Sequence, residues 1–299
     1  MKSICIAAMA LLCYSCQRKI TPVAAPAQQQ AISALPTAGM LLGTHTKEDL
    51  QQAPYAAWFN KNYGDYIIDS PAIARLKPLL QNKQFEIFLG TWCGDSKREV
   101  PRMLKLLEYA GVQASQVKLI MVDNHDGTYK QSPTHEEKGK SIHRVPTLIM
   151  YDDKKELNRI VEYPVVSLEQ DLLAIATAAQ YQPNYKGAAY LLQLAAANSP
   201  AIILKDSINT IQKLQALLQR STELNALGYV WMASGETAKA LMAFQLNAQL
   251  FPTDANVYDS LGEIYTKLDK KAEARLYYQK VLQLQPGNTN AVKMLAQLN

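Results

Sequence analysis

The carboxyl-terminal third of the chain contains an internal repeat, and its period of 34 residues is the strongest constraint on the fold. Large apolar residues, a glycine, a small residue and a proline recur at matching positions. Leu224, Leu227, Gly228, Trp231, Ala240, Phe244 and Pro252 return as Tyr258, Leu261, Gly262, Tyr265, Ala274, Tyr278 and Pro286. A fixed period of this length indicates stacked supersecondary units. We expect each copy to form two closely crossing helices, in which large residues fill the gap beside glycine and alanine and the proline ends the second helix.

This pattern resembles the tetratricopeptide repeat at nearly every consensus position. The resemblance implies repeats at about 221–254 and 255–288, followed by a capping helix at 289–298. Two repeats bury little apolar surface alone, because each unit covers its apolar face only by stacking on a neighbour. We therefore expect degenerate helices at Ala188–Ala196 and Ala201–Leu218 to extend the stack or to dock it onto a preceding domain.

A second informative stretch is Trp-Cys-Gly-Asp-Ser at residues 92–96. Residues 85–90 before it are apolar and aromatic, which is typical of a buried strand. Residues 96–110 after it carry apolar side chains at helical spacing. A cysteine at a helix start faces unpaired backbone N–H groups and the positive end of the helix dipole, which favours thiolate over thiol. Cys93 is therefore a candidate nucleophile.

These residues resemble the active-site loop of the thioredoxin superfamily, Trp-Cys-Gly-Pro-Cys. Pro101 stands where thioredoxins carry the proline of this helix, and Val145-Pro146-Thr147 resembles the turn that opens a buried strand with a cis proline. In the family that turn lies against the active cysteine and holds substrate backbone. The resemblance thus implies catalysis by Cys93 and substrate binding by Trp92, Gly94, Val145 and Pro146.

The expected order of elements agrees with this resemblance, which covers about Glu48 to Ala179. We expect an α/β thioredoxin-like domain at 48–180, followed by an all-α tetratricopeptide-repeat domain at 185–299. Residues Lys47–Tyr63 have helical spacing and should pack onto the first domain. The remaining elements are a helix at Pro71–Gln81, the strand and helix around Cys93, a strand at Val117–Val122, the strand after Pro146, a strand at Glu156–Tyr163 and a helix at Ser167–Ala178.

The loop departs from the family in its resolving residue. Ser96 replaces the second cysteine, Asp95 replaces the proline, and Ile87 stands where the family has a buried acid. A serine hydroxyl cannot form a disulfide, so it cannot release a mixed disulfide as a second thiolate does. The loop is therefore that of a monothiol variant; the alternative is a decayed fold in which Cys93 is a spectator.

Residues 1–16 have the pattern of a bacterial lipoprotein signal peptide. Lys2 supplies the positive charge, Ile4 to Leu12 form an apolar run too short to span a bilayer, and Ser15-Cys16 resembles the end of a lipobox. We expect lipidation at Cys16 and a lipid-anchored, periplasm-facing protein of the bacterial cell envelope. The alternative is an ordinary secretory signal cut near Ser15.

The cysteine count then limits the redox chemistry. Cys5 and Cys13 would leave with the signal peptide and Cys16 would be capped, so Cys93 would be the free thiol of the mature chain. Any disulfide exchange would therefore be intermolecular. Residues 17–47, rich in Ala, Gln and Pro, have the composition of a flexible tether.

Composition offers little support for other functions. The formal net charge of +5 is mild and the basic residues are scattered, so nucleic-acid binding is not indicated. We expect no cofactor and no metal. His125, His135 and His143 lie in a long polar insert between Val122 and Pro146 and suggest a copper site, but such sites usually need two close cysteines. The insert is better explained as a surface loop that shapes partner access.

Two functions follow from these patterns. The first is an envelope thiol-disulfide oxidoreductase or isomerase that acts through Cys93 on protein partners. The second is a non-catalytic, lipid-tethered scaffold that binds proteins with the thioredoxin fold and the repeat surface. The lipid membrane is the expected second partner, through the anchor at Cys16.

The anchor can be tested by metabolic labelling with a radioactive fatty acid. The wild type should become labelled and Cys16→Ala should not, because the acceptor thiol is removed. Equal labelling of both proteins, or labelling of neither, would contradict lipidation at Cys16.

Overall fold

The computed structural model describes residues 39–298. The predicted signal peptide, the predicted lipidation residue Cys16 and most of the predicted tether at 17–47 lie outside the described residues. Within residues 39–298, no helix combines the length and the hydropathy that crossing a membrane requires.

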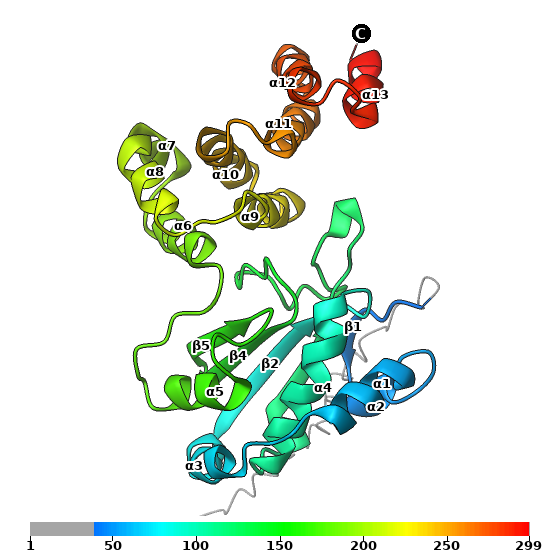
Figure 1. The fold of residues 1–299 in the computed structure, drawn as a ribbon, viewed down its shortest axis with the longest axis vertical. Coiled ribbons are helices and arrows are strands. Elements are labelled where there is room, and N and C mark those ends of the chain that lie inside the picture. Colours follow the sequence, from blue (N-terminus) through cyan, green and yellow to red (C-terminus); the bar gives the residue numbers. More distant parts are fainter. Residues whose placement is uncertain (1–38, 299) are drawn as a thin grey trace, which may run out of the picture. The chain divides into compact units, whose positions relative to one another are not determined.

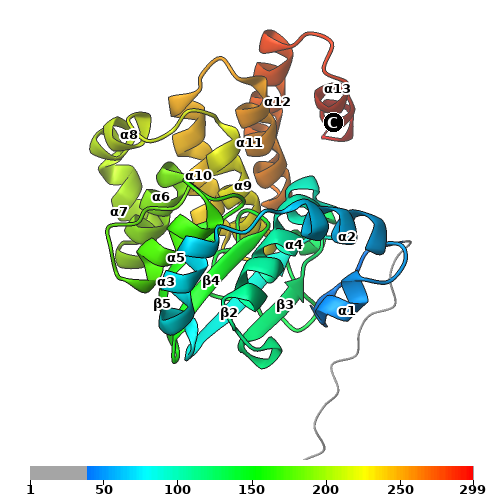
Figure 2. The same ribbon diagram turned by 60° about the horizontal axis from the view of Figure 1, so that its bottom comes forward.

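The first part of the described chain is built on a five-stranded mixed sheet in the order β1-β3-β2-β4-β5. Its strands are β1 (Gly43–His45), β2 (Lys83–Leu89), β3 (Val117–Met121), β4 (Thr147–Asp152) and β5 (Lys155–Val161). The central strands β2 and β3 are parallel, whereas β1 pairs antiparallel with β3, β4 with β2, and β5 with β4. The turned view of Figure 2 shows β3, β2 and β4 as neighbours.

Among the described residues, helices α1 to α5 accompany the sheet (Figure 1). They are α1 (Lys47–Leu50), α2 (Ala56–Asp65), α3 (Ser70–Leu80), α4 (Gly94–Tyr109) and α5 (Leu168–Ala176). Helix starts follow ordinary capping chemistry, since the side chains of Thr46, Asp69 and Ser167 accept hydrogen bonds from the first turns of α1, α3 and α5.

The alternation of residues along each strand divides the sheet into two different faces. Phe85, Ile87 and Leu89 on β2 are buried in one core with apolar residues of the helices, among them Leu76 and Met103. The intervening residue Phe88 belongs to a second, smaller cluster on the opposite face. The same alternation places Glu86 on the face opposite to that of Phe85 and Ile87.

The smaller cluster is covered by the irregular insert that follows β3. Phe88, Ile120 and Ile149 are packed with Ile142 and Val145 from this insert. The insert at 122–146 contains a short 3₁₀ helix, η2 (Asp126–Thr128), and another, η1 (Ala114–Gln116), precedes β3. The sequence predicts a polar surface loop here, but part of the insert is buried because the apolar end of the sheet needs a cover.

Two differences from the predicted boundaries lie before β2. Residues 43–45 were expected in the tether, yet they form β1 and pair with β3. The helical stretch expected over Lys47–Tyr63 is divided into α1 and α2, with Pro54 between them. Proline has no N–H to donate and its ring clashes with the preceding turn, which disfavours a continuous helix at this position.

The remainder of the described chain is helical. Its elements are α6 (Lys186–Ala197), α7 (Pro200–Lys205), α8 (Ser207–Gln215), α9 (Thr222–Ala233), α10 (Thr237–Leu250), α11 (Ala255–Lys267), α12 (Lys271–Leu284) and α13 (Thr289–Gln297). The predicted helical hairpins correspond to α9–α10 and α11–α12, followed by the expected capping helix α13. The stretch predicted at Ala201–Leu218 is divided between α7 and α8.

The repeat geometry rests on close packing of an aromatic ring against a glycine. A Cβ atom built on Gly228 of α9 would lie 2.4 Å from Cε1 of Phe244 in α10. In the next repeat, a Cβ on Gly262 would lie 2.7 Å from Tyr278. Both rings are buried in a close-packed core, so neither can move aside to make room for a Cβ atom. The glycine and the aromatic residue of the sequence pattern therefore form a single contact.

We predict that Gly228→Ala destabilises the protein by about 1–3 kcal/mol through overpacking. The sign is diagnostic, because Gly→Ala in an unobstructed helix normally gains about 0.5–1 kcal/mol. Gly64→Ala is the matched control: Gly64 lies in α2 and a Cβ there meets nothing within 4 Å. Urea unfolding should show opposite changes in the two variants, and a gain in both would contradict the packing assignment.

Candidate thiol site

Cys93 lies at the N-cap of the 16-residue helix α4, directly after β2. Its backbone N–H donates to the carbonyl of Gly90 at 2.9 Å, and its own carbonyl accepts from the Lys97 N–H at 3.0 Å. The side chain is half-buried and forms no cap hydrogen bond. The thiol is therefore held at the positive end of a long helix while remaining accessible to solvent.

The thiol contacts a turn that is distant in sequence. Cys93 Sγ donates to the carbonyl oxygen of Val145 at 3.3 Å. The Val145–Pro146 bond is cis, as the sequence predicts. This turn is fixed from both sides: the Pro146 carbonyl accepts from the Glu162 N–H at 2.7 Å, and the Arg144 carbonyl accepts from Thr147 Oγ1 at 2.8 Å. Three of the predicted site residues, Cys93, Val145 and Pro146, are therefore brought together.

Trp92 and Gly94 flank the thiol in different ways. Trp92 Nε1 donates to the carbonyl of Val122 at 2.9 Å, and the indole covers Gly90, where a Cβ would lie only 2.4 Å from the ring. This arrangement ties the loop to the end of β3. A Cβ on exposed Gly94 would meet nothing within 4 Å, so the space beside Cys93 is open on that side. Substrate binding by Trp92 and Gly94 stays a prediction.

Ser96, in the position of a resolving cysteine, is fully buried. Its Oγ accepts a hydrogen bond from the Gly90 N–H at 3.2 Å. A buried N–H without an acceptor costs about 1–3 kcal/mol. Ser96 therefore satisfies the backbone of the turn that precedes Cys93.

The insert contains a buried lysine that no pattern in the sequence indicates. Lys130, in the insert, is only 4 % exposed. Its ammonium donates to the Tyr129 hydroxyl and lies 3.7 Å from the centroid of that ring. Burial, together with the smaller effect of the Arg144 guanidinium, lowers the pKa of Lys130 to about 7, and the Cys93 and Glu162 side chains partly oppose this shift. Burial also raises the pKa of Tyr129, and the charge of Cys93 adds to that shift.

Arg144 and Glu162 provide further charges beside the proline turn. Their side chains lie 3.9 Å apart, from Arg144 Nη1 to Glu162 Oε1. Arg144 also donates through Nη2 to the carbonyl of Thr222 at 2.9 Å, and its guanidinium lies 4.7 Å from the ring centroid of Tyr185. Burial raises the pKa of Glu162, whereas Arg144 lowers it.

The histidines considered as copper ligands are separated. His125 Nδ1 lies 2.6 Å from Asp123, and His135 Nδ1 lies 3.1 Å from Glu137. His143 is buried, with Nδ1 3.2 Å from the carbonyl of Ser141 and its ring edge-on to Tyr185. Across residues 39–298, no group of three or more His, Cys, Asp or Glu side chains is arranged to hold a metal.

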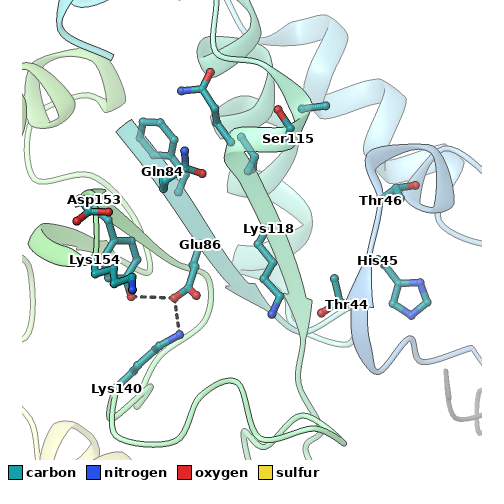
Figure 3. Close-up of a pocket in the computed structure, with 15 residues that line it drawn as sticks. Thr44, His45, Thr46, Gln84, Glu86, Ser115, Lys118, Lys140, Asp153 and Lys154 are labelled. Carbon is teal, nitrogen blue, oxygen red and sulfur yellow. Dashed lines mark hydrogen bonds and ion pairs between the residues drawn. The ribbon is translucent and has the colours of Figure 1, made fainter. Parts of the chain in front are cut away.

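A separate hollow of about 700 Å³ occupies the polar half of the sheet face that the insert leaves open. Within this hollow, Glu86 on β2 accepts from Lys140 Nζ at 2.5 Å and from the Tyr151 hydroxyl at 2.8 Å (Figure 3). Cys93 is not among the residues that line this hollow. The hollow is therefore separate from the candidate thiol site.

Comparison with known proteins gives one family match. Residues 255–288 match the model of the tetratricopeptide repeat family, which is the second predicted repeat and contains α11 and α12. A search of curated proteins finds no match.

The buried imidazole predicts how stability depends on pH. Burial lowers the pKa of His143 to about 3 from an ordinary 6.5, and the Ser141 carbonyl only partly offsets this. Below pH 6.5 the His143 imidazole therefore binds a proton in the unfolded chain but stays neutral in the folded chain. The free energy of unfolding falls as pH decreases towards 3. From pH 6.5 to 5, above the usual range of carboxylates, this amounts to about 2 kcal/mol.

Urea unfolding at pH 7 and pH 5 should show this loss in the wild type and a smaller loss in His143→Gln. His125→Gln, at an exposed histidine, is the control and should behave as the wild type. Identical pH dependence in His143→Gln and the wild type would contradict the assignment.

Proposed function

We propose that this chain is a thioredoxin-like monothiol oxidoreductase or isomerase, which exchanges disulfides with protein partners through Cys93. The observation that carries the proposal is the placement of a half-buried thiol at the N-terminus of α4, 3.3 Å from the carbonyl of Val145. Helix N-termini favour thiolates, and the thiolate is the attacking species in disulfide exchange.

The order of elements supports thioredoxin-likeness. The sequence α3, β2, α4, β3, β4, β5, α5 is the order that the resemblance implies, with Cys93 between β2 and α4 and Pro146 directly before β4. The turn at Pro146 and the thiol are adjacent, as a site that holds substrate backbone beside the nucleophile requires.

The burial of Ser96 gives the proposed chemistry its particular character. Cys93 attacks a disulfide of the partner, a bond forms between the two sulfurs, and the partner's other sulfur leaves as a thiolate. Ser96 cannot attack the mixed disulfide, because its oxygen forms no bond of this kind and is engaged with the Gly90 N–H. Release then depends on a second thiol of the partner or of another molecule.

We further propose that this chemistry takes place in the bacterial cell envelope. The proposal rests on the amino-terminal sequence, in which Ser15-Cys16 follows a short apolar run, and includes lipidation at Cys16 with residues 17–47 as a tether.

The alternative is a non-catalytic scaffold, and the repeat match is the observation that favours it. A tetratricopeptide repeat at 255–288 suggests protein–protein interaction, which needs no reaction at Cys93. A thiol that does not react with disulfides would favour this alternative.

We predict that Ser96→Cys converts the protein into a better reductase. The new thiol would stand one helical turn from Cys93, so intramolecular attack could release the partner. In a dithiol-driven assay with a model protein disulfide, the variant should turn over well above the wild type, while the wild type should accumulate mixed disulfides. Cys93→Ala is the control and should abolish both the activity and the mixed disulfides.

The result that overturns the catalytic proposal is equally definite. If Ser96→Cys gains no activity and Cys93 of the wild type resists alkylation at neutral pH, the scaffold function replaces it. Thermal unfolding of each variant ensures that the comparison is made between folded proteins.

A further inference from the structure

Another hollow, of about 560 Å³, lies where the insert meets the repeat helices. The insert supplies one wall, and helices α9, α11, α12 and α13 supply the other. The lining residues are Asn124, Asp126, Tyr129, Tyr229, Glu263, Tyr278, Asn290 and Met294. None of them belongs to the candidate thiol site, so the chemistry of this hollow can be considered separately from that of Cys93.

The aromatic wall of the hollow joins the insert to the first helix pair. The ring of Tyr129 is edge-on to that of Tyr229 in α9, with the ring centroids 6.4 Å apart. Tyr229 in turn packs edge-on against Phe244, the buried ring that fills the space beside Gly228. The position of this wall is therefore fixed by the same packing that holds α9 and α10 together.

The acidic groups of the hollow are held in place by hydrogen bonds from the repeat helices. Tyr229 Oη donates to Glu263 Oε2 at 2.8 Å, and Asn290 Nδ2 donates to Asp259 Oδ1 at 2.8 Å. Burial raises the pKa of Glu263, the Tyr229 hydroxyl opposes this shift, and the charges of Asp259 and Asp126 add to it. The insert and α11 thus bring carboxylates together that repel one another.

Within residues 39–298, Asp126, Asp259 and Glu263 form no ion pair. The described side chains that line the hollow include no lysine, arginine or histidine. Lys267, one turn further along α11, is exposed, and its charge lowers the pKa of Glu263, which burial and the two aspartates nevertheless raise. The same part of the chain has no group of three His, Cys, Asp or Glu side chains arranged to hold a metal. The hollow therefore suits an organic cation better than a metal ion.

We propose that this hollow binds a lysine or arginine side chain of a partner protein. Aromatic rings attract an ammonium or guanidinium group, and a carboxylate attracts it more strongly in a partly buried site than at an open surface. Both kinds of group line the hollow, in Tyr229 and Tyr278 and in Asp126 and Glu263. The cation would complete the charge balance that the described residues leave open.

A protein segment fits this hollow better than a free amine. Residues 255–288, which include Glu263 and Tyr278, match the tetratricopeptide repeat family, and stacked helical repeats form extended binding surfaces. Asn124, Asp126 and Tyr129 come from the insert and not from a repeat, so the insert contributes to the choice of partner. This interaction goes beyond the proposed function, because it requires no reaction at Cys93.

The test follows the methyl resonance of Met294, which lines the hollow, by NMR of the full chain with isotopically labelled methionine methyl groups. The resonance is assigned with Met294→Leu. The probe is an acetylated and amidated alanine heptapeptide with lysine at its centre, and the matched peptide has norleucine there, which keeps the aliphatic chain and removes the charge. The lysine peptide should shift the resonance until it saturates, and the norleucine peptide should leave it unchanged.

The affinity for the lysine peptide should then depend on the two acidic side chains of the hollow. Glu263→Gln and Asp126→Asn should each weaken binding about tenfold, because each removes a charged partner of the ammonium. Glu48→Gln, at an exposed acid of α1, is the matched control and should bind as the wild type does. Asp126 is exposed, so its variant tests the proposal even if the change at Glu263 disturbs the fold.

Three results would overturn the proposal. Equal shifts with both peptides, or no shift with either at millimolar concentration, would show that the hollow does not recognise the charge. Unchanged affinity in both acidic variants would mean that the peptide binds elsewhere. If n-butylamine shifts the Met294 resonance as strongly as the lysine peptide at equal concentration, the hollow takes a small amine and the protein partner is wrong. None of these results bears on Cys93, so the proposed function is tested separately.

Discussion

The candidate site depends on the burial of one apolar patch of the sheet. Phe88, Ile120 and Ile149 face away from the main helical core and must be covered. The insert covers this patch with Ile142 and Val145. It thereby brings the turn at Pro146 and the loop at Lys130 to the end of β2, where Cys93 caps the start of α4. The same contacts that stabilise this face therefore assemble the groups around the thiol.

The covering segment also determines the electrostatics. If the insert were only a surface loop, all of its lysines would be exposed to solvent, as Lys138 is. Because the insert folds onto the sheet, Lys130 and His143 are buried. Burial is the largest cause of the lowered pKa of each, ahead of the charge of half-buried Arg144.

The parts of this structure that sequence could predict are those governed by short-range patterns. The 34-residue period identified the helix pairs because Gly228 and Phe244 form one contact that recurs as Gly262 and Tyr278. The junction between β2 and α4 at Cys93 could also be predicted, because it too follows from a short-range pattern of apolar residues. By contrast, β1 is three residues long and owes its existence to pairing with β3, which leaves no periodic signal. Lys130 could not be anticipated either, since a lysine in a polar insert gives no sign that the insert will fold inwards.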